Sequence, residues 1–167
     1  MYLGTVIAKH LPKPMRKSLF ITLLLGVCVF NAHAQTKSNL QAGLRLGLPF
    51  GGTARYFLND ANGLEAIAGA YAHTFTVTGL YEHYFDLSAL TTEGFAWFIG
   101  GGAHMGSRET DGNVKLIGGV DGIAGIDYTF PTFPLNLSLD WKPAIHFNTS
   151  SDLADFAISV RYTFGRR

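Results

Sequence analysis

The residues closest to a hydrolytic arrangement lie near the C-terminal end of the sequence. His146 is followed by Ser150 and Ser151, with Asp152 and Asp155 close behind. A serine nucleophile needs a histidine base and an acid that orients the base, so this set could support hydrolysis of a lipid ester. However, the sequence has no G-x-S-x-G elbow, and Ser and Asp in loops are usually turn formers. We therefore assign no catalytic residue and keep a lipid-modifying hydrolase as an alternative function.

Histidines and glycines are the other residues whose types could bind a ligand. The four histidines after residue 35 (His73, His83, His104 and His146) lack i, i+4 spacing and have no C-x-x-C pair beside them. Gly100–Gly102 resembles a phosphate-binding loop in composition, but it lies in a strand pattern with no helix after it. We interpret the glycines as sites of close strand approach or bending, and we expect no metal and no cofactor.

Charged and polar residues alternate with apolar ones along most of the chain. Successive side chains of a strand point to opposite faces, so such segments have one polar and one apolar face. If these strands form a narrow barrel, the polar face lines the lumen, where isolated charges would be costly and must pair. The predicted lumen network is structural and comprises Arg45, Glu82, Asp121, Asp127, Asp140, Lys142 and Arg161, with Arg55, Glu65 and His104 as further candidates.

Eight segments with this alternation must position those residues. No sustained 3.6-residue period is present after residue 35, and most segments have about 9–14 residues, which suits tilted transmembrane strands better than the short strands of a soluble sandwich. The sequence therefore predicts an all-β fold, an eight-stranded antiparallel up-and-down transmembrane β-barrel with both termini at one end. The segments are Leu40–Leu48, Thr53–Leu58, Leu64–Tyr71, Thr74–Phe85, Phe95–Met105, Val114–Phe130, Leu135–Phe147 and Phe156–Phe164, and the outer loops are residues 49–52, 72–74, 106–113 and 148–155.

The sixth and seventh segments also predict a pairing register. If Pro131–Pro134 closes their hairpin, the two residue numbers of each cross-strand pair add up to about 263. This register sets Asp121 opposite Lys142 and Gly122 opposite Trp141. This register separates polar from apolar side chains, and a slip by one residue would mix them. Extended across the last loop, the same reasoning predicts that Asp140 lies near Arg161.

The first 34 residues have the organisation of an export signal. Basic residues precede an apolar run of about twelve residues, Leu19–Phe30, and Ala32-His33-Ala34 follows as a cleavage pattern. That run is shorter than the roughly 20 residues of a spanning helix. We predict a signal peptide over residues 1–34, with Met15 as an alternative start, and a barrel domain over 35–167. Hydrophobic residues make up 47% of the chain and charged residues only 15%.

After cleavage the chain would contain no cysteine and no excess of basic over acidic residues. Its only cysteine, Cys28, lies in the signal, so no disulfide is expected. The remaining charge is slightly acidic, which argues against a nucleic-acid partner.

The last segment, Phe156–Phe164, carries the clearest family resemblance. Its apolar face ends in two aromatic residues, and it resembles the terminal strand by which the assembly machinery recognises bacterial outer-membrane barrels, although Gly165-Arg166-Arg167 follows the last aromatic. Segments such as Arg55–Asp60 and Leu135–Pro143 are similar to those of small outer-membrane barrels of the OmpA/OmpX-like architecture. The proposed assembly signal comprises Phe156, Ile158, Val160, Tyr162 and Phe164.

The resemblance implies a location and a fold but no catalytic residue. We expect an integral protein of the bacterial outer membrane, reached after signal-peptide export, with a structural or interaction role and a lumen plugged by polar side chains. Its expected partners are outer-membrane lipid and, during biogenesis, the barrel-assembly machinery, and we expect a monomer. A soluble periplasmic, lipocalin-like barrel that binds an apolar ligand is a further alternative, and it predicts an apolar lumen.

Overall fold

The computed structural model describes residues 39–110, 112–148 and 150–165, all of them in strands, turns or loops. This part of the chain contains no helix long and apolar enough to span a membrane. The signal peptide predicted over residues 1–34 lies outside the described residues. The strands are β1 (Leu40–Gly47), β2 (Phe50–Phe57), β3 (Asn62–Tyr71), β4 (Thr74–Asp86), β5 (Phe95–Thr110), β6 (Asn113–Thr129), β7 (Leu135–Trp141), β8 (Ala144–His146) and β9 (Phe156–Phe164).

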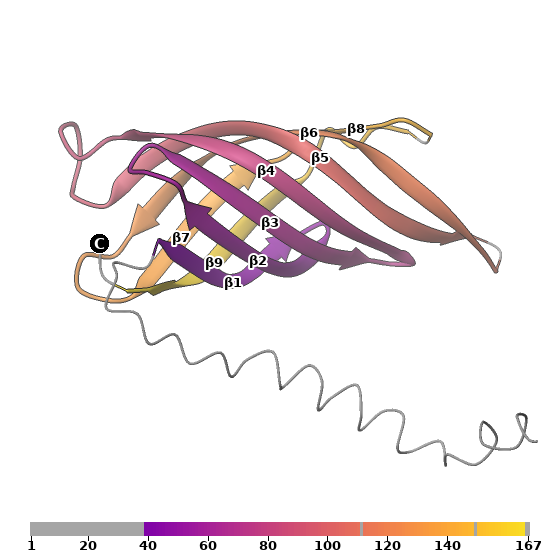
Figure 1. Ribbon diagram of the computed structural model, residues 1–167, viewed down its shortest axis with the longest axis horizontal. Coiled ribbons are helices and arrows are strands. Elements are labelled where there is room, and N and C mark those ends of the chain that lie inside the picture. The colour runs from indigo at the N-terminus through magenta and orange to yellow at the C-terminus, as the bar shows by residue number, and fades with distance from the viewer. Residues whose placement is uncertain (1–38, 111, 149, 166–167) are drawn as a thin grey trace, which may run out of the picture. The chain divides into compact units, whose positions relative to one another are not determined.

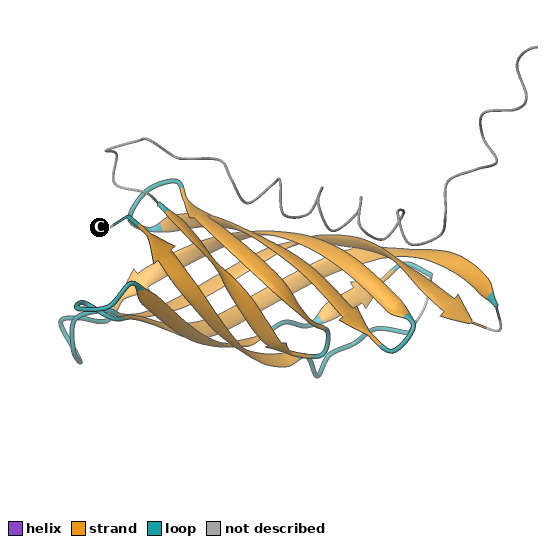
Figure 2. Cartoon of the chain, turned by 90° about the horizontal axis from the view of Figure 1, so that it is seen from below, coloured by secondary structure: helices purple, strands orange, loops and turns teal. Residues whose placement is uncertain are grey.

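The strands close into an antiparallel barrel in which β1 to β7 pair in sequence order, β7 pairs with β9, and β9 pairs with β1 (Figures 1 and 2). β7 and β8 together occupy one strand position of the barrel, because both pair with β6 in a single register. We call each such position in the barrel wall a stave. Pro143 interrupts this stave since it has no N–H to donate, but its carbonyl still accepts a 2.9 Å hydrogen bond from the Gly122 N–H. The nine strand segments therefore make eight staves, which confirms the predicted eight-stranded up-and-down barrel.

The barrel wall is apolar outside and largely polar inside. Along β7, Leu137, Leu139 and Trp141 are 38–48% exposed, whereas Asn136, Ser138 and Asp140 between them are buried. Seventeen polar or charged residues but only nine apolar ones are buried in the described part of the chain. The alternation therefore assigns faces as predicted, and the apolar face is the exposed one.

The staves differ in length, and this difference corrects two expectations. β1 and β2 have 8 residues each, while β5 has 16 and β6 has 17, so the β5–β6 hairpin extends beyond its neighbours at one end (Figure 1). The loop predicted over 106–113 is mostly strand, with Arg108 paired to Lys115, because a ribbon projecting into solvent tolerates charge on both faces. The turn predicted over 49–52 is shorter, since Gly51 and Gly52 already pair with neighbouring strands.

The register predicted for the sixth and seventh staves is wrong by two residues. Phe130 N–H donates to the Leu135 carbonyl at 3.0 Å, so the turn spans residues 131–134 and the pairs sum to 265. Gly122 consequently lies opposite Pro143, and Trp141 lies opposite Ala124. A shift of two residues keeps every side chain on its face, which is why alternation alone could not detect the error.

Candidate functional site

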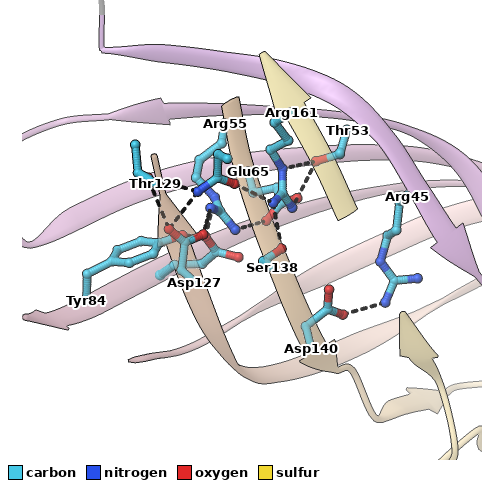
Figure 3. A network of polar contacts seen from close by, with 12 residues as sticks. Arg45, Thr53, Arg55, Glu65, Tyr84, Asp127, Thr129, Ser138, Asp140 and Arg161 are labelled. Carbon is cyan, nitrogen blue, oxygen red and sulfur yellow. Dashed lines mark hydrogen bonds and ion pairs between the residues drawn. The ribbon is translucent and has the colours of Figure 1, made fainter. Parts of the chain in front are cut away.

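Five charged residues form one cluster in the lumen, which we call the inner cluster because it lies toward the end where Leu40 pairs with Phe164. Its members are Arg55, Glu65, Glu82, Asp127 and Arg161, and all but Glu82 are labelled in Figure 3. The Arg55 guanidinium contacts three carboxylates, at 3.1 Å from Glu65, 3.1 Å from Glu82 and 2.7 Å from Asp127. All five are at most 4% exposed, so the charges compensate one another with little help from bulk water.

Arg161 joins this cluster to the neighbouring strands. It forms a 2.5 Å ion pair with Glu65 and donates to the Ser138 hydroxyl at 2.7 Å and to the Asn136 amide oxygen at 3.3 Å. The Asn136 amide in turn donates to Asp127 at 2.7 Å. These contacts connect β9, β3, β7 and β6 across the lumen, so each ionised group has several fixed partners.

Aromatic rings surround the Arg55 end of the inner cluster. The guanidinium carbon lies 5.2 Å from the ring centroids of both Tyr84 and Phe98, a distance at which a cation and an aromatic face attract. The Tyr84 hydroxyl donates to Glu82. Gly125 makes room for the buried Phe98 ring, since a Cβ on Gly125 would lie 2.7 Å from the ring. The inner cluster is therefore both ion-paired and enclosed by rings.

A second group, the outer cluster, lies toward the opposite end and comprises Arg45, His104, Asp121, Asp140, Lys142 and Asp155. Arg45 pairs with Asp140 at 2.6 Å and with Asp155 at 3.2 Å, and Figure 3 shows the first of these pairs apart from the contacts around Arg55. Lys142 pairs with Asp155 at 3.1 Å and with Asp121 at 3.3 Å. The cations and carboxylates thus alternate along one continuous chain of contacts.

Two histidines continue that chain to the outer opening. His104 Nδ1 lies 2.8 Å from Asp121 Oδ2, and His104 Nε2 lies 2.8 Å from Nδ1 of His146, which is half-buried. His104 pairs with Gly119 of β6, which pairs with His146 of β8, so the two imidazoles meet above a glycine. A Cβ on Gly119 would lie 2.7 Å from His104 Cε1 and 2.1 Å from the Ile145 carbonyl oxygen. The glycine is therefore what permits this contact.

The structure buries every side chain predicted for the lumen network and divides the set between the two clusters. The predicted contact between Asp140 and Arg161 is wrong. Asp140 pairs with Arg45, because β9 sets Ala157 opposite Asp140 and sets Arg161 opposite Asn136. Asp155 was missed as a partner because it lies in a loop, where the sequence carries no alternation to reveal its direction.

The arrangement around His146 differs from that of a hydrolase. Its Nδ1 contacts His104, while Asp155 is occupied by Arg45 and Lys142. Ser150 and Ser151 are exposed. Among the described residues, no hydrogen bond joins either serine to His146, whose Nδ1 contacts His104. In the part of the chain that the structure describes, no group of three or more His, Cys, Asp or Glu side chains is placed to hold a metal ion.

Two recesses flank the clusters. The larger, about 750 Å³, opens at the inner end and has Asp60, Asp86, Glu93 and Asp127 among its lining residues, with no Lys or Arg among the described ones. The smaller, about 130 Å³, lies at the outer end and is lined partly by His104 and His146. The charged clusters occupy the lumen between these recesses.

No protein-family model matches the chain, and no curated protein sequence matches it. Among solved structures, it is similar to the N-terminal β-barrel domain of Pseudomonas aeruginosa OprF, with a TM-score of 0.57 and 15% identity over 76% of this chain and 100% of that one. It also matches Neisserial surface protein A (NspA), with a TM-score of 0.45 and 13% identity over 75% of this chain and 94% of that one. The first likeness shows that this chain shares the β-barrel fold of that domain.

Proposed function

We propose that the chain is an integral outer-membrane barrel protein with a structural or interaction role and a lumen closed to solutes. The observation that carries this proposal is the inverted wall: Leu, Val, Ile or aromatic side chains face outward on every stave, and the charged side chains of the strands face inward except near strand ends, as at Asp86, Glu109 and Lys115. Exposing so much apolar surface to water would be unfavourable at roughly 25 cal/mol per Å², whereas lipid accepts it. A membrane is the environment that this wall fits.

The closure of the lumen is inferred from the two clusters. An eight-stranded barrel has an interior just wide enough for side chains to fill. Arg45, Arg55 and Arg161 are each at most 1% exposed and reach partners on other strands across this interior. A solute would have to displace these ion pairs to pass, so we expect no stable pore in the resting barrel.

The same proposal covers how the protein is exported and assembled in the membrane. Residues 1–34 would direct export, and the apolar face of β9 would serve as the signal for the barrel-assembly machinery. Phe156, Ile158 and Tyr162 on that face are 49–62% exposed, which leaves them accessible on the outside of the wall. Outer-membrane lipid would then be the principal partner of the folded monomer.

The two alternatives receive less support. A lipocalin-like barrel needs an apolar cavity, but polar and charged residues dominate the buried set here. A lipid hydrolase would need His146 beside a serine, and its partner is His104.

Fractionation of cells that express the chain tests this proposal. We expect the barrel to leave the membrane only with detergent, to migrate faster on gels before heating than after, and to give no steady conductance in planar bilayers. Release of the mature protein by osmotic shock would contradict membrane integration. A steady conductance from a detergent-extracted, heat-modifiable barrel would contradict the closed lumen alone.

A further inference from the structure

We infer that His104 and His146 form a binding site for a divalent transition-metal ion of the copper or nickel type at the outer opening of the barrel. This site goes beyond the membrane role proposed above and does not depend on whether the lumen conducts. It would use two protein nitrogens, with water completing the coordination.

The separation of the two ring nitrogens suits this role. Two nitrogen ligands at right angles around a metal, each about 2.0–2.1 Å from it, lie about 2.9 Å apart. His104 Nε2 and His146 Nδ1 are 2.8 Å apart. The same distance suits a hydrogen bond between the two nitrogens in the metal-free site. A bound ion would lie to one side of the line that joins the nitrogens, so metal binding would turn each ring until its lone pair points at the ion. On metal binding, the proton of His146 Nδ1 would move to Nε2 of the same ring.

Asp121 supplies the outer support that metal-binding histidines commonly have. Metal-ligating imidazoles usually donate their second N–H to a carboxylate, which fixes the tautomer and orients the ring. His104 Nδ1 lies 2.8 Å from Asp121 Oδ2, and the other Asp121 oxygen lies 3.3 Å from Lys142 Nζ. Because a carboxylate oxygen accepts, we assign the His104 tautomer with its N–H at Nδ1 and the lone pair of Nε2 toward His146.

The strands hold both rings in place and leave them accessible. The row His104–Gly119–His146 crosses three neighbouring strands, so the backbone fixes the distance between the histidines. Gly119 is the central position of this row, and its missing side chain leaves the space in which the rings meet. His104 is 7% exposed, but both rings line the 130 Å³ outer recess, through which an ion and its waters can enter.

The charges around the recess also permit a cation. Its lining includes three carboxylates, Asp121, Asp152 and Asp155, against two permanent cations, Arg108 and Lys142. Asp121 and Asp155 both pair with Lys142, which offsets its positive charge. Imidazole ligands favour copper, nickel and zinc over magnesium or calcium, and copper is expected to bind most tightly.

Copper titration of the untagged protein, extracted from membranes in detergent, tests the site. We expect one Cu²⁺ per barrel, with an electron paramagnetic resonance spectrum that shows two coordinated nitrogens and disappears with EDTA. His146→Ala should abolish this signal, as should His104→Ala. His83→Ala is the matched control, because His83 lies on β4 and contacts Asn62 instead. Asp121→Asn should weaken affinity by about 10–100-fold.

Heat-modifiable migration on a gel establishes that each variant is folded before it is titrated. His146→Ala is the more informative variant, since His146 lies at the rim and its replacement leaves both clusters intact. Saturable binding by the wild type that His146→Ala does not weaken would overturn the assignment, as would the absence of a two-nitrogen signal from folded wild-type protein.

Discussion

The inner and outer clusters contain the same permanent charges in different surroundings. Each has two cations and three carboxylates: Arg55 and Arg161 with Glu65, Glu82 and Asp127 in the inner cluster, and Arg45 and Lys142 with Asp121, Asp140 and Asp155 in the outer one. Each therefore holds one carboxylate in excess. Besides its two cations, each cluster has one further side chain that donates a hydrogen bond to a carboxylate. The clusters differ in which side chain this is.

In the inner cluster that donor is Tyr84, whose hydroxyl bonds Glu82 and whose ring stacks on Phe98 at a centroid distance of 5.3 Å. In the outer cluster it is His104, which contacts Asp121 and then His146 at the opening. A phenol surrounded by rings keeps its proton, whereas an imidazole exchanges a proton or binds a metal readily. The same permanent charges thus lie beside a buried phenol at one level of the barrel and beside an imidazole near the opening at the other.

The largest expected difference between the clusters concerns loss of a central cation. Arg55→Met would leave Glu65, Glu82 and Asp127 buried without their shared partner, and removal of one member of a buried ion pair costs about 3–5 kcal/mol. We expect this loss in urea unfolding followed by gel mobility in detergent or lipid vesicles. Lys115→Met, at an exposed position, is the control and should change stability by less than about 0.5 kcal/mol. An equally small effect of Arg55→Met would contradict the ion-paired interior.

A smaller loss is expected in the outer cluster. Lys142→Met removes the partner shared by Asp121 and Asp155, but water from the outer recess can solvate these carboxylates. We therefore expect about 1–3 kcal/mol in the same unfolding assay. A loss as large as that of Arg55→Met would show that the outer cluster is as isolated from solvent as the inner one.

The smallest and most closely matched comparison uses two buried serines that face each other on β7 and β9. The Ser138 hydroxyl accepts from Arg161 at 2.7 Å, whereas Ser159 Oγ has no hydrogen-bond partner among the described residues. Ser138→Ala should cost about 1–3 kcal/mol, and Ser159→Ala should be neutral or slightly stabilising. The reverse order of the two unfolding free energies would contradict the assignment of a hydrogen-bond partner to Ser138 but not to Ser159.

Alternation in the sequence was sufficient to predict which face of each strand points into the lumen, but it could not place Asp155, which lies in a loop. Arg45, Asp127 and Arg161 are buried because their strands send every second side chain inward, and this property survives an error of two residues in register. Their partners depend on pairing across several strands. Arg45 reaches Asp140 and Asp155, which are 95 and 110 positions away in sequence, and no local pattern encodes those distances.

The histidine contact was missed for the same reason. His104 and His146 are 42 positions apart, and they meet only because β5, β6 and β8 align in one row with Gly119 between them. The sequence signal was present as an inward-facing histidine on each of two strands. Its use required the β6–β8 register, and the register predicted from the sequence was two residues away from the observed one.

Tryptophan fluorescence in lipid vesicles tests the inverted wall most directly. The chain has two tryptophans, and both Trp97 and Trp141 lie on the outer face, 38% and 43% exposed. In vesicles of lipids brominated along the acyl chain, we expect bromine contact to quench the emission of Trp97→Phe and Trp141→Phe, each of which retains one tryptophan. Full emission from both folded, vesicle-bound variants would contradict a lipid-facing wall.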